Sequence, residues 1–327
     1  MMNLFCKWVI LFLMILSAGS APFNGKRFEN SNSKMEKSLS QIVQFLREKA
    51  SLDWPEEIPL KQQDKPPVLI PDSQLRASFV NHATVLLQTH GLNFLTDPVW
   101  SKRASPFSFI GPKRVHSPGI DFKDLPKIDY VLISHNHYDH LDLETLVRLE
   151  KAFKPTFLVG LKVSSNLRKS LPNAKIIELD WGQAYEISND KKIYFLPAQH
   201  WSARWPWDRN QTLWGAFAIQ LPGGNIYFAG DTGYAEHFKQ AQKQFGKFRL
   251  ALLPIGAYEP RDFMKYQHMN PADAVQAAKD LKTEHALGIH FGCFPLATEA
   301  YDGPKKEIKR LKLPVFQVLE PGEFRFF

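Results

Sequence analysis

One short segment constrains this chain more than any other. Residues 134–140 read Ser-His-Asn-His-Tyr-Asp-His, directly after the β-prone apolar run 128–133. The run predicts a buried strand, and imidazoles and carboxylates are metal ligands. His135 and His137 are two residues apart, so in an extended turn both imidazoles can face one metal ion. The Asp and the final His of the segment would then bind a neighbouring ion. We therefore predict a two-metal site at a strand end.

A two-metal site needs further ligands, and three polar residues at the ends of later apolar strands supply them. His200 ends the strand-like run 193–199, Asp231 follows 226–230, and His290 ends 286–289. A core residue would have no reason to be polar at these positions. Taken singly, each would more often be a surface residue, but together they complete a coordination set. The predicted metal ligands are His135, His137, Asp139, His140, His200, Asp231 and His290.

From about Leu75 onward, short strands alternate with a few helices. No glycine-rich phosphate loop and no internal repeat is present, which argues for sheets layered with helices and against a dinucleotide-binding fold. The expected strands include 79–80, 85–87, 92–96, 128–133, 175–179, 193–196, 215–221, 226–228 and 250–253, and the expected helices cover 141–149 and 271–281.

The first residues predict the compartment. The apolar run 8–16 follows Lys7 and precedes the small residues 17–21, as in a signal peptide. The run is shorter than the ~20 residues of a membrane-spanning helix, although an uncleaved anchor stays open. Cys6 and Cys293 are the only cysteines, so cleavage would leave no intrachain disulfide. We expect an exported protein, periplasmic or secreted if bacterial, that associates peripherally with a membrane.

A polar arm follows the signal and contains one amphipathic stretch. Four of its apolar residues recur at helical spacing: Leu39, Ile42, Val43 and Leu46. We expect a short helix docked on the main domain, with a membrane-surface or dimer helix as the alternative. The predicted organisation is a signal peptide at 1–21, an arm at 22–74 and a catalytic domain at 75–327.

Charge and aromatic content indicate an anionic partner. Lys and Arg number 41 against 33 acidic residues, a net charge of +8, which favours phospholipid, phosphate esters or nucleic acid. Tryptophan and arginine cluster within 201–214, and aromatic and basic residues cluster again within 100–114. Such clusters suit a membrane interface, but nucleic-acid stacking would use the same residues, and buried core is the alternative for at least half of the tryptophans.

The ordered ligand set resembles the metallo-β-lactamase superfamily, and longer motifs over about 75–327 resemble its N-acylphosphatidylethanolamine-hydrolysing phospholipase D family. This chain has Asn81-His82 where that family has Gly-His. The resemblance tips the balance from nucleic acid to lipid. The motifs are Asn81–Thr84, Leu95–Pro98, Gly111–Arg114, Pro197–Trp201, Leu213–Gly215, Phe228–Tyr234, Pro254–Arg261 and Lys265–His268.

The resemblance implies an α/β fold, an αβ/βα sandwich of two central mixed sheets flanked by helices, with two zinc ions at its open edge. It assigns His135, His137 and His200 to the first zinc. It assigns Asp139, His140 and His290 to the second, with Asp231 as the bridge. Five imidazoles favour zinc over iron or manganese. A hydroxide shared by the two ions would be the nucleophile.

Four further residues receive less specific roles. Asp97 and His82 could orient ligating imidazoles from behind, although ordinary turn capping is the alternative. Tyr138 and His268 are expected to donate to the phosphate or to protonate the leaving oxygen. The expected catalytic set is therefore Tyr138, Asp139, Asp231 and His268.

The function implied by the resemblance is hydrolysis of N-acylphosphatidylethanolamine-like phospholipids to N-acylethanolamine and phosphatidic acid. The expected partners are the phospholipid and a membrane surface, no nucleic acid is expected, and a homodimer stays open. One alternative is a hydrolase of another ester, a lactone or another phosphodiester. The other is a non-catalytic metal-binding protein of the cell envelope, whose zinc site would be closed by protein ligands.

Overall fold

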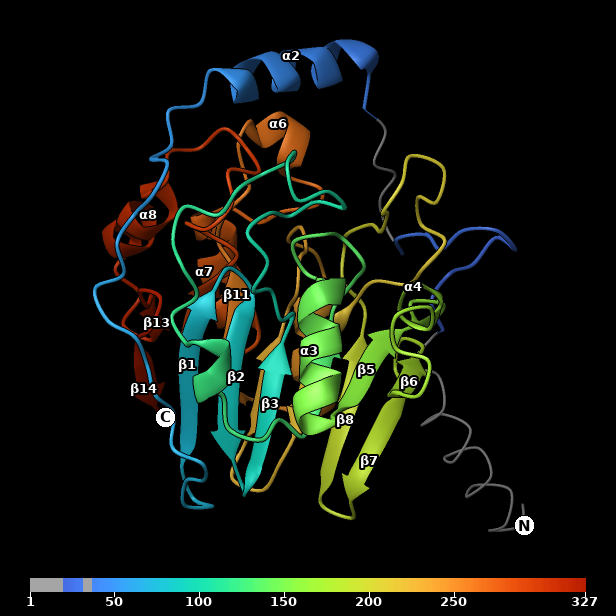
Figure 1. The fold of residues 1–327 in the computed structure, drawn as a ribbon, viewed down its shortest axis with the longest axis vertical. Helices are drawn as coiled ribbons and strands as arrows, with labels where there is room; N and C mark the ends of the chain where they lie inside the picture. The colour runs from blue at the N-terminus through green and yellow to red at the C-terminus, as the bar shows by residue number, and fades with distance from the viewer. Residues whose placement is uncertain (1–19, 32–36) are drawn as a thin grey trace, which may run out of the picture.

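The computed structural model describes residues 20–31 and 37–327, so most of the predicted signal segment, including Cys6, lies outside the described residues. Two seven-stranded mixed sheets pack together with helices on their outer faces (Figure 1). This architecture confirms the predicted αβ/βα sandwich. Most of the apolar core lies between the sheets, where Phe79, Phe195 and Trp214 are fully buried.

The first sheet has the order β14-β1-β2-β3-β4-β5-β6. Strands β3 to β6 run parallel to one another, and β14, β1, β2 and β3 pair antiparallel. Parallel strands are covered on both faces, which explains the continuous apolar run before the histidine segment. The bounds are β1 Leu75–Asn81, β2 Thr84–Thr89, β3 Leu92–Thr96, β4 Tyr130–Ile133, β5 Thr156–Gly160, β6 Lys175–Leu179 and β14 Phe324–Phe326.

The second sheet repeats this plan in the order β13-β12-β11-β10-β9-β8-β7. Strands β10 to β13 run parallel, whereas β7 to β10 form an antiparallel meander. The bounds are β7 Ala184–Ser188, β8 Lys191–Leu196, β9 Ala216–Gln220, β10 Asn225–Phe228, β11 Phe248–Pro254, β12 His285–Ile289 and β13 Phe316–Gln317.

The helices begin at residues that satisfy their free backbone amides. Asp142 caps α3 by accepting from the amide of Thr145, and Asn270 forms a capping box with Asp273 at α7. Leu146 and Leu149 of α3 pack on the first sheet. The bounds are α2 Leu39–Ala50, η1 Phe122–Asp124, α3 Leu143–Phe153, α4 Ser164–Leu167, α5 His237–Phe245, α6 Arg261–Met264, α7 Pro271–Asp280 and α8 Gly303–Leu311.

Helix α2 of the arm crosses the same end of the molecule as α6 (Figure 1). Phe45 stacks on Phe263 with ring centroids 4.8 Å apart. The four apolar residues expected to dock the helix are instead exposed, Leu39 by 82%. Helical spacing shows that these four residues share one face of the helix, but it does not show which face contacts the domain. Phe45, on another face of α2, makes the contact with the domain. In the described residues, no helix has the length and apolar character needed to cross a bilayer.

Candidate metal centre

The predicted ligands converge from separate strand ends. The histidine segment follows β4, His200 follows β8, Asp231 follows β10 and His290 follows β12. The carboxyl ends of parallel strands meet at one edge of a sheet, which is where ligand sites of layered α/β folds form. The structure therefore brings together all seven side chains: His135, His137, Asp139, His140, His200, Asp231 and His290.

The first group contains three imidazoles. His135 Nε2 lies 2.7 Å from His137 Nδ1, and His200 Nε2 lies 3.3 Å from the same atom. His135 and His200 are buried. Ring nitrogens this close cannot all carry protons, so the group offers a set of lone pairs directed at one point.

The second group combines imidazoles with carboxylates. The Nε2 atoms of His140 and His290 each lie 3.3 Å from Asp139 Oδ2. They also lie 3.2 and 3.0 Å from Asp231 Oδ2. Because Asp231 Oδ2 is also 3.8 Å from His200 Nε2, its carboxylate lies between the two groups, as the bridging assignment requires.

Local backbone geometry is strained around these ligands. His82, Asp97 and His290 have φ values of 46°, 31° and 58°, in a region that side chains other than glycine rarely adopt. Such strain concentrates at functional sites. Gly230, directly before Asp231, has φ 57°, and a Cβ there would lie 2.5 Å from Ser134 Cβ. Glycine is therefore required for Asp231 to approach the histidine segment.

Buried carboxylates determine the charge of the second group. Burial alone would raise the pKa of Asp231, but the imidazoles of His140 and His290 outweigh it and hold the pKa well below its usual range. Burial opposes protonation of His290, but Asp231 and Asp139 raise its pKa to about 9. The carboxylates thus attract positive charge to the point where their oxygens converge.

Two groups outside the ligand set, the Asp97 carboxylate and the Gln267 backbone carbonyl, fix the orientation of imidazole rings. Asp97 Oδ2 accepts from His140 Nδ1 at 2.6 Å and from the Ser134 hydroxyl at 2.6 Å. The Gln267 carbonyl accepts from His200 Nδ1 at 2.9 Å. Each of the two bonds to an imidazole leaves the opposite nitrogen, Nε2, directed toward the cluster. The structure thus places Asp97 behind the His140 imidazole, where it could act as the orienting residue considered in the sequence analysis.

The other predicted residues differ in their placement. His82 Nε2 lies 2.9 Å from Asp139 Oδ2, and His268 Nδ1 lies 3.8 Å from Asp231 Oδ2. Tyr138 is not brought into the cluster. Its hydroxyl donates to the Arg204 carbonyl at 3.0 Å, so the proton expected to serve a substrate is used by the protein.

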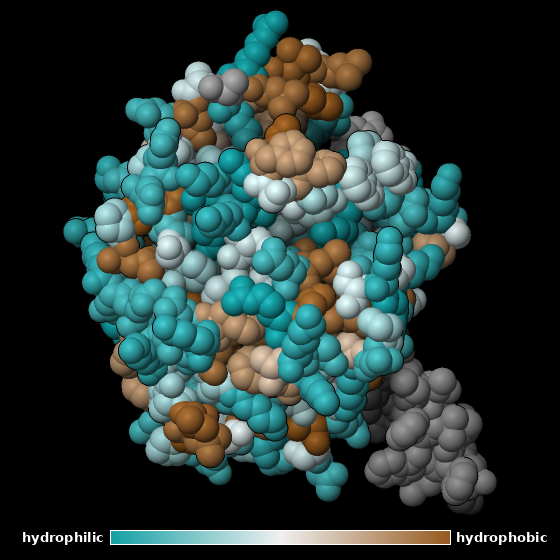
Figure 2. Space-filling model, viewed as in Figure 1, coloured by the Kyte–Doolittle hydropathy of each residue, from teal (hydrophilic) through white to brown (hydrophobic). Residues whose placement is uncertain are grey.

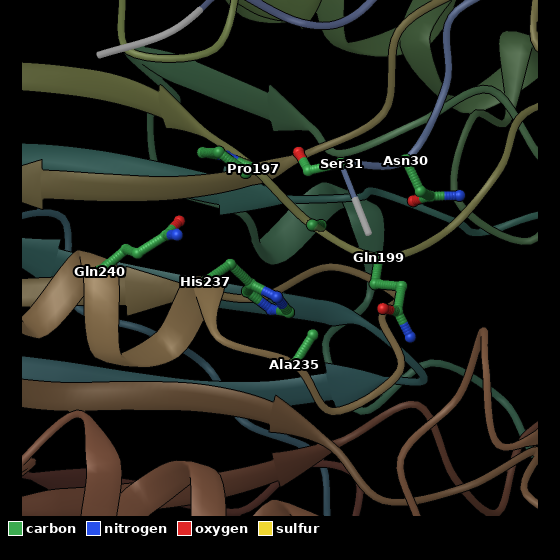
Figure 3. Close-up of a pocket in the computed structure, with 8 residues that line it drawn as sticks. Asn30, Ser31, Pro197, Gln199, Ala235, His237 and Gln240 are labelled. Carbon is green, nitrogen blue, oxygen red and sulfur yellow. The ribbon is translucent and has the colours of Figure 1, made fainter. Parts of the chain in front are cut away.

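Two residues hold parts of the cluster in place although no sequence motif indicated that role. Asn30 of the arm exchanges two hydrogen bonds with the His200 backbone, at 2.8 and 3.0 Å. It borders a small cavity of about 30 Å³ that Gln199 and His237 also line (Figure 3). Arg204 donates to the carbonyls of Asn136 and Leu141 and so braces the histidine segment. Nothing in the local sequence relates these residues to segments so distant along the chain.

The cluster has the donor chemistry of a divalent metal centre. The ligand atoms of His135, His137 and His200 lie within 4.8 Å of one another, and so do those of Asp139, His140, His290 and His82. Asp231 Oδ1 is buried without a hydrogen-bond partner in the part of the chain that the structure describes, and a cation would satisfy it. Because the donors are nitrogen and oxygen only, the residues fit transition metals such as zinc.

Comparison with known proteins agrees with this fold. Residues 92–291 match the β-lactamase superfamily domain, so the chain belongs to the metallo-β-lactamase superfamily. The solved structure of Igni18, a metallo hydrolase from Ignicoccus hospitalis, covers 78% of this chain and 98% of its own at a TM-score of 0.59 and 21% identity. That likeness shows the fold alone.

Two relatives are more informative. The chain is 40% identical over 251 residues to the N-acyl-phosphatidylethanolamine-hydrolyzing phospholipase D 1 of Caenorhabditis elegans, covering 73% of this chain and 70% of that protein. It is 36% identical over 228 residues to the mitochondrial enzyme of that name from Saccharomyces cerevisiae, covering 68% of this chain but 48% of the yeast protein. These similarities identify the chain as a metal-dependent hydrolase.

Proposed function

We propose that this hydrolase is a dinuclear zinc phosphodiesterase of phospholipase D type that cleaves N-acylphosphatidylethanolamine-like phospholipids. The single observation that carries the proposal is the position of Asp231 Oδ2 between the two ligand groups, 3.0 Å from His290 Nε2 and 3.8 Å from His200 Nε2. That position suits two adjacent cations, the arrangement used for in-line displacement at phosphorus. The named relatives supply the substrate class.

The chain's own residues would hold the ions and orient the substrate. His135, His137 and His200 would hold one ion, and Asp139, His140 and His290 the other. Bound divalent cations supply Lewis acidity toward a phosphodiester and acidify water. In the reaction, water oxygen bonds to phosphorus, the bond from phosphorus to the ethanolamine oxygen breaks, and that oxygen takes up a proton.

His268 is the proposed hydrogen-bond donor to the phosphate. Burial lowers the pKa of His268 well below its usual value, and the carboxylate of Asp231 only partly opposes it. A neutral imidazole still carries one N–H. Its Nδ1 has no hydrogen-bond partner in the described residues, and its ring packs on those of His200 and His290, beside the centre.

A groove beside the histidine segment supports the proposal of a lipid substrate. It has a volume of about 800 Å³, and its walls include Trp100, Phe107, Tyr138, Leu141 and Trp205. These apolar side chains would accept an acyl chain. The groove is also lined by Lys102, Arg103 and Arg204 and by the carboxylates of Asp142 and Glu144, so it is only partly apolar.

Exposed apolar side chains support contact with a membrane. Trp205 and Trp207 stack in parallel with centroids 5.3 Å apart and are 42% and 67% exposed. Figure 2 shows hydrophobic residues gathered at the end of the molecule where Figure 1 places α2. Tryptophan prefers the bilayer interface, so we propose peripheral binding through this end, together with the exported location predicted from the first residues.

Vesicle sedimentation tests the membrane contact. Leu39→Gln with Leu46→Gln removes two exposed apolar side chains from α2 and should weaken binding to phospholipid vesicles by about tenfold. Val68→Gln with Leu69→Gln removes two equally exposed side chains elsewhere in the arm and should leave binding unchanged. Equal losses in both pairs would contradict a role for α2.

Product analysis in ¹⁸O-labelled water tests the reaction. Purified zinc-loaded protein should convert N-acylphosphatidylethanolamine to N-acylethanolamine and phosphatidic acid, with the label in the phosphatidic acid because water attacks phosphorus. The Asp231→Ala variant serves as the control for contaminating lipases. Release of a free fatty acid, or inertness toward phospholipids with turnover of a lactone, would replace the proposal with hydrolysis of another bond.

A further inference from the structure

A second cavity lies between the arm and the loop that follows β3. It has a volume of about 640 Å³. The arm contributes Lys49, Leu52 and Trp54 to its lining, and the loop contributes Arg103 and Lys113. The amide of Ile58 donates to the Val115 carbonyl at 2.5 Å, which ties the arm to the loop and keeps the two walls together.

The cavity is lined by an excess of positive charge. Lys49, Arg103 and Lys113 face it with a single carboxylate, Glu56. Across residues 20–31 and 37–327, none of these three cations forms an ion pair. The site therefore has uncompensated charge that an anion would neutralise.

The loop sets two of the cations directly opposite one another. Arg103 and Lys113 form an antiparallel bridge, flanked by hydrogen bonds from Ala104 N to Pro112 O at 3.0 Å and from Arg114 N to Lys102 O at 2.9 Å. Side chains at such positions lie about 5 Å apart, and like charges there are destabilising. A bound anion would turn this repulsion into attraction.

One further cation, Arg114, follows Lys113 in the loop and adds to the positive field. Arg114 is buried, and its Nη1 has no hydrogen-bond partner in the portion described by the structure.

We propose that this cavity binds the phosphate group of a phosphomonoester, carried either by a lipid headgroup or by a small soluble ester. A phosphate dianion matches two ammonium groups and one guanidinium fork. Leu52, Trp54 and Pro295 supply apolar wall for the rest of the ligand. The inference goes beyond the proposed reaction, because binding here requires no bond to break and no ligand of the metal centre.

Isothermal titration calorimetry of the zinc-loaded full chain tests the site. The probes are inorganic phosphate, glycerol 3-phosphate and dihexanoyl phosphatidic acid, with dihexanoyl phosphatidylcholine as the zwitterionic control. Wild type should show a phosphomonoester site besides any binding at the metal centre. The Arg103→Gln/Lys113→Gln variant should lose that site or bind at least tenfold more weakly, with metal content unchanged.

A matched control removes two charges elsewhere. Lys169 and Lys279 are exposed, and the pair Lys169→Gln/Lys279→Gln should bind as wild type does. Because Arg103 also donates to the Gly111 carbonyl, the Lys49→Gln/Lys113→Gln variant tests the site with that bond intact. Binding of all three phosphate probes would assign recognition to the phosphate group alone, and binding of phosphatidic acid alone would assign it to a lipid headgroup. Unchanged binding in both cavity variants would overturn the proposal.

Discussion

The cluster of histidine and aspartate side chains and the N-terminal arm differ in how the fold holds them in place. The cluster sits at the ends of strands, and its side chains are buried, apart from the partly buried His137, and lie close to one another. The arm is polar and contributes no ligand, and it holds its place through a few long-range contacts. These contacts include the stack of Phe45 on Phe263, the bond from Trp54 Nε1 to the Glu299 carbonyl, the bond from Ile58 N to the Val115 carbonyl, and the two bonds of Asn30 to His200.

The difference separates two tasks within one molecule. The sheet edge fixes the chemistry, because strands buried in the core cannot shift without loss of packing. The arm adjusts the cluster at His200 and builds one wall of the cationic cavity. Substitutions in the cluster should therefore abolish activity, whereas those in the arm should change its level.

The largest effect should come from the bridging carboxylate. Asp231→Ala removes the oxygen that lies 3.0 Å from His290 Nε2 and 3.2 Å from His140 Nε2. We expect loss of bound metal and a fall in kcat of at least about 10³-fold. Metal analysis by mass spectrometry alongside the hydrolysis assay checks this, and full metal content with full activity would refute the bridging role.

A smaller loss of metal affinity is expected from a substitution of Asp97, which contacts the His140 imidazole. Asp97→Asn is nearly isosteric but places an amide N–H near donors, because Asp97 accepts from His140 Nδ1, the Ser134 amide and the Ser134 hydroxyl. Metal affinity should fall by about 10- to 100-fold, measured by competition with a chromophoric chelator. Asp190→Asn, an exposed surface change, is the control, and equal affinities in both variants would show that Asp97 does not orient the imidazole.

The arm should contribute less than the cluster. Asn30→Ala removes two hydrogen bonds to the His200 backbone, each worth about 1 kcal/mol. We expect metal affinity or kcat to decrease by about three- to thirtyfold. Asn24→Ala, whose side chain bonds only within the arm, should have no effect on either quantity. If Asn30→Ala were as harmful as Asp231→Ala, the separation of tasks would fail.

The smallest effect concerns stability at the contact between arm and cluster. Burial lowers the pKa of His237 to about 3, below its unfolded value of about 6.5. The unfolded chain then binds the extra proton first, so stability is complete above pH 6.5 and is lost as the pH falls toward 3. His237→Gln should reduce that slope by up to about 1.4 kcal/mol per pH unit. Urea unfolding at pH 5 and pH 7 measures it, and parallel slopes would contradict the prediction.

The sequence was most informative where chemistry and secondary structure coincide. Five histidines and two aspartates at strand ends indicated a two-metal site, because polar residues there have no packing role. The apolar run before His135 indicated a buried strand, and β4 lies there between two parallel neighbours. The resemblance supplied the sandwich, which no periodicity could have specified.

The rest depends on contacts between residues far apart along the chain. Asn30 and His200 are 170 positions apart, and an asparagine in a polar arm looks like any turn residue. The outward apolar face of α2 was likewise hidden, because spacing defines a face without saying what covers it. Tyr138 lies inside the histidine segment, yet its hydroxyl donates to the Arg204 carbonyl. The sequence could not indicate this bond, because Arg204 is 66 positions away along the chain.

Anomalous X-ray diffraction at the zinc absorption edge, from crystals of the zinc-loaded protein, tests the central claim most directly. The account predicts two neighbouring peaks, one among His135, His137 and His200 and the other among Asp139, His140 and His290, with the Asp231 carboxylate between them. A single peak, or none at full zinc occupancy in solution, would contradict it.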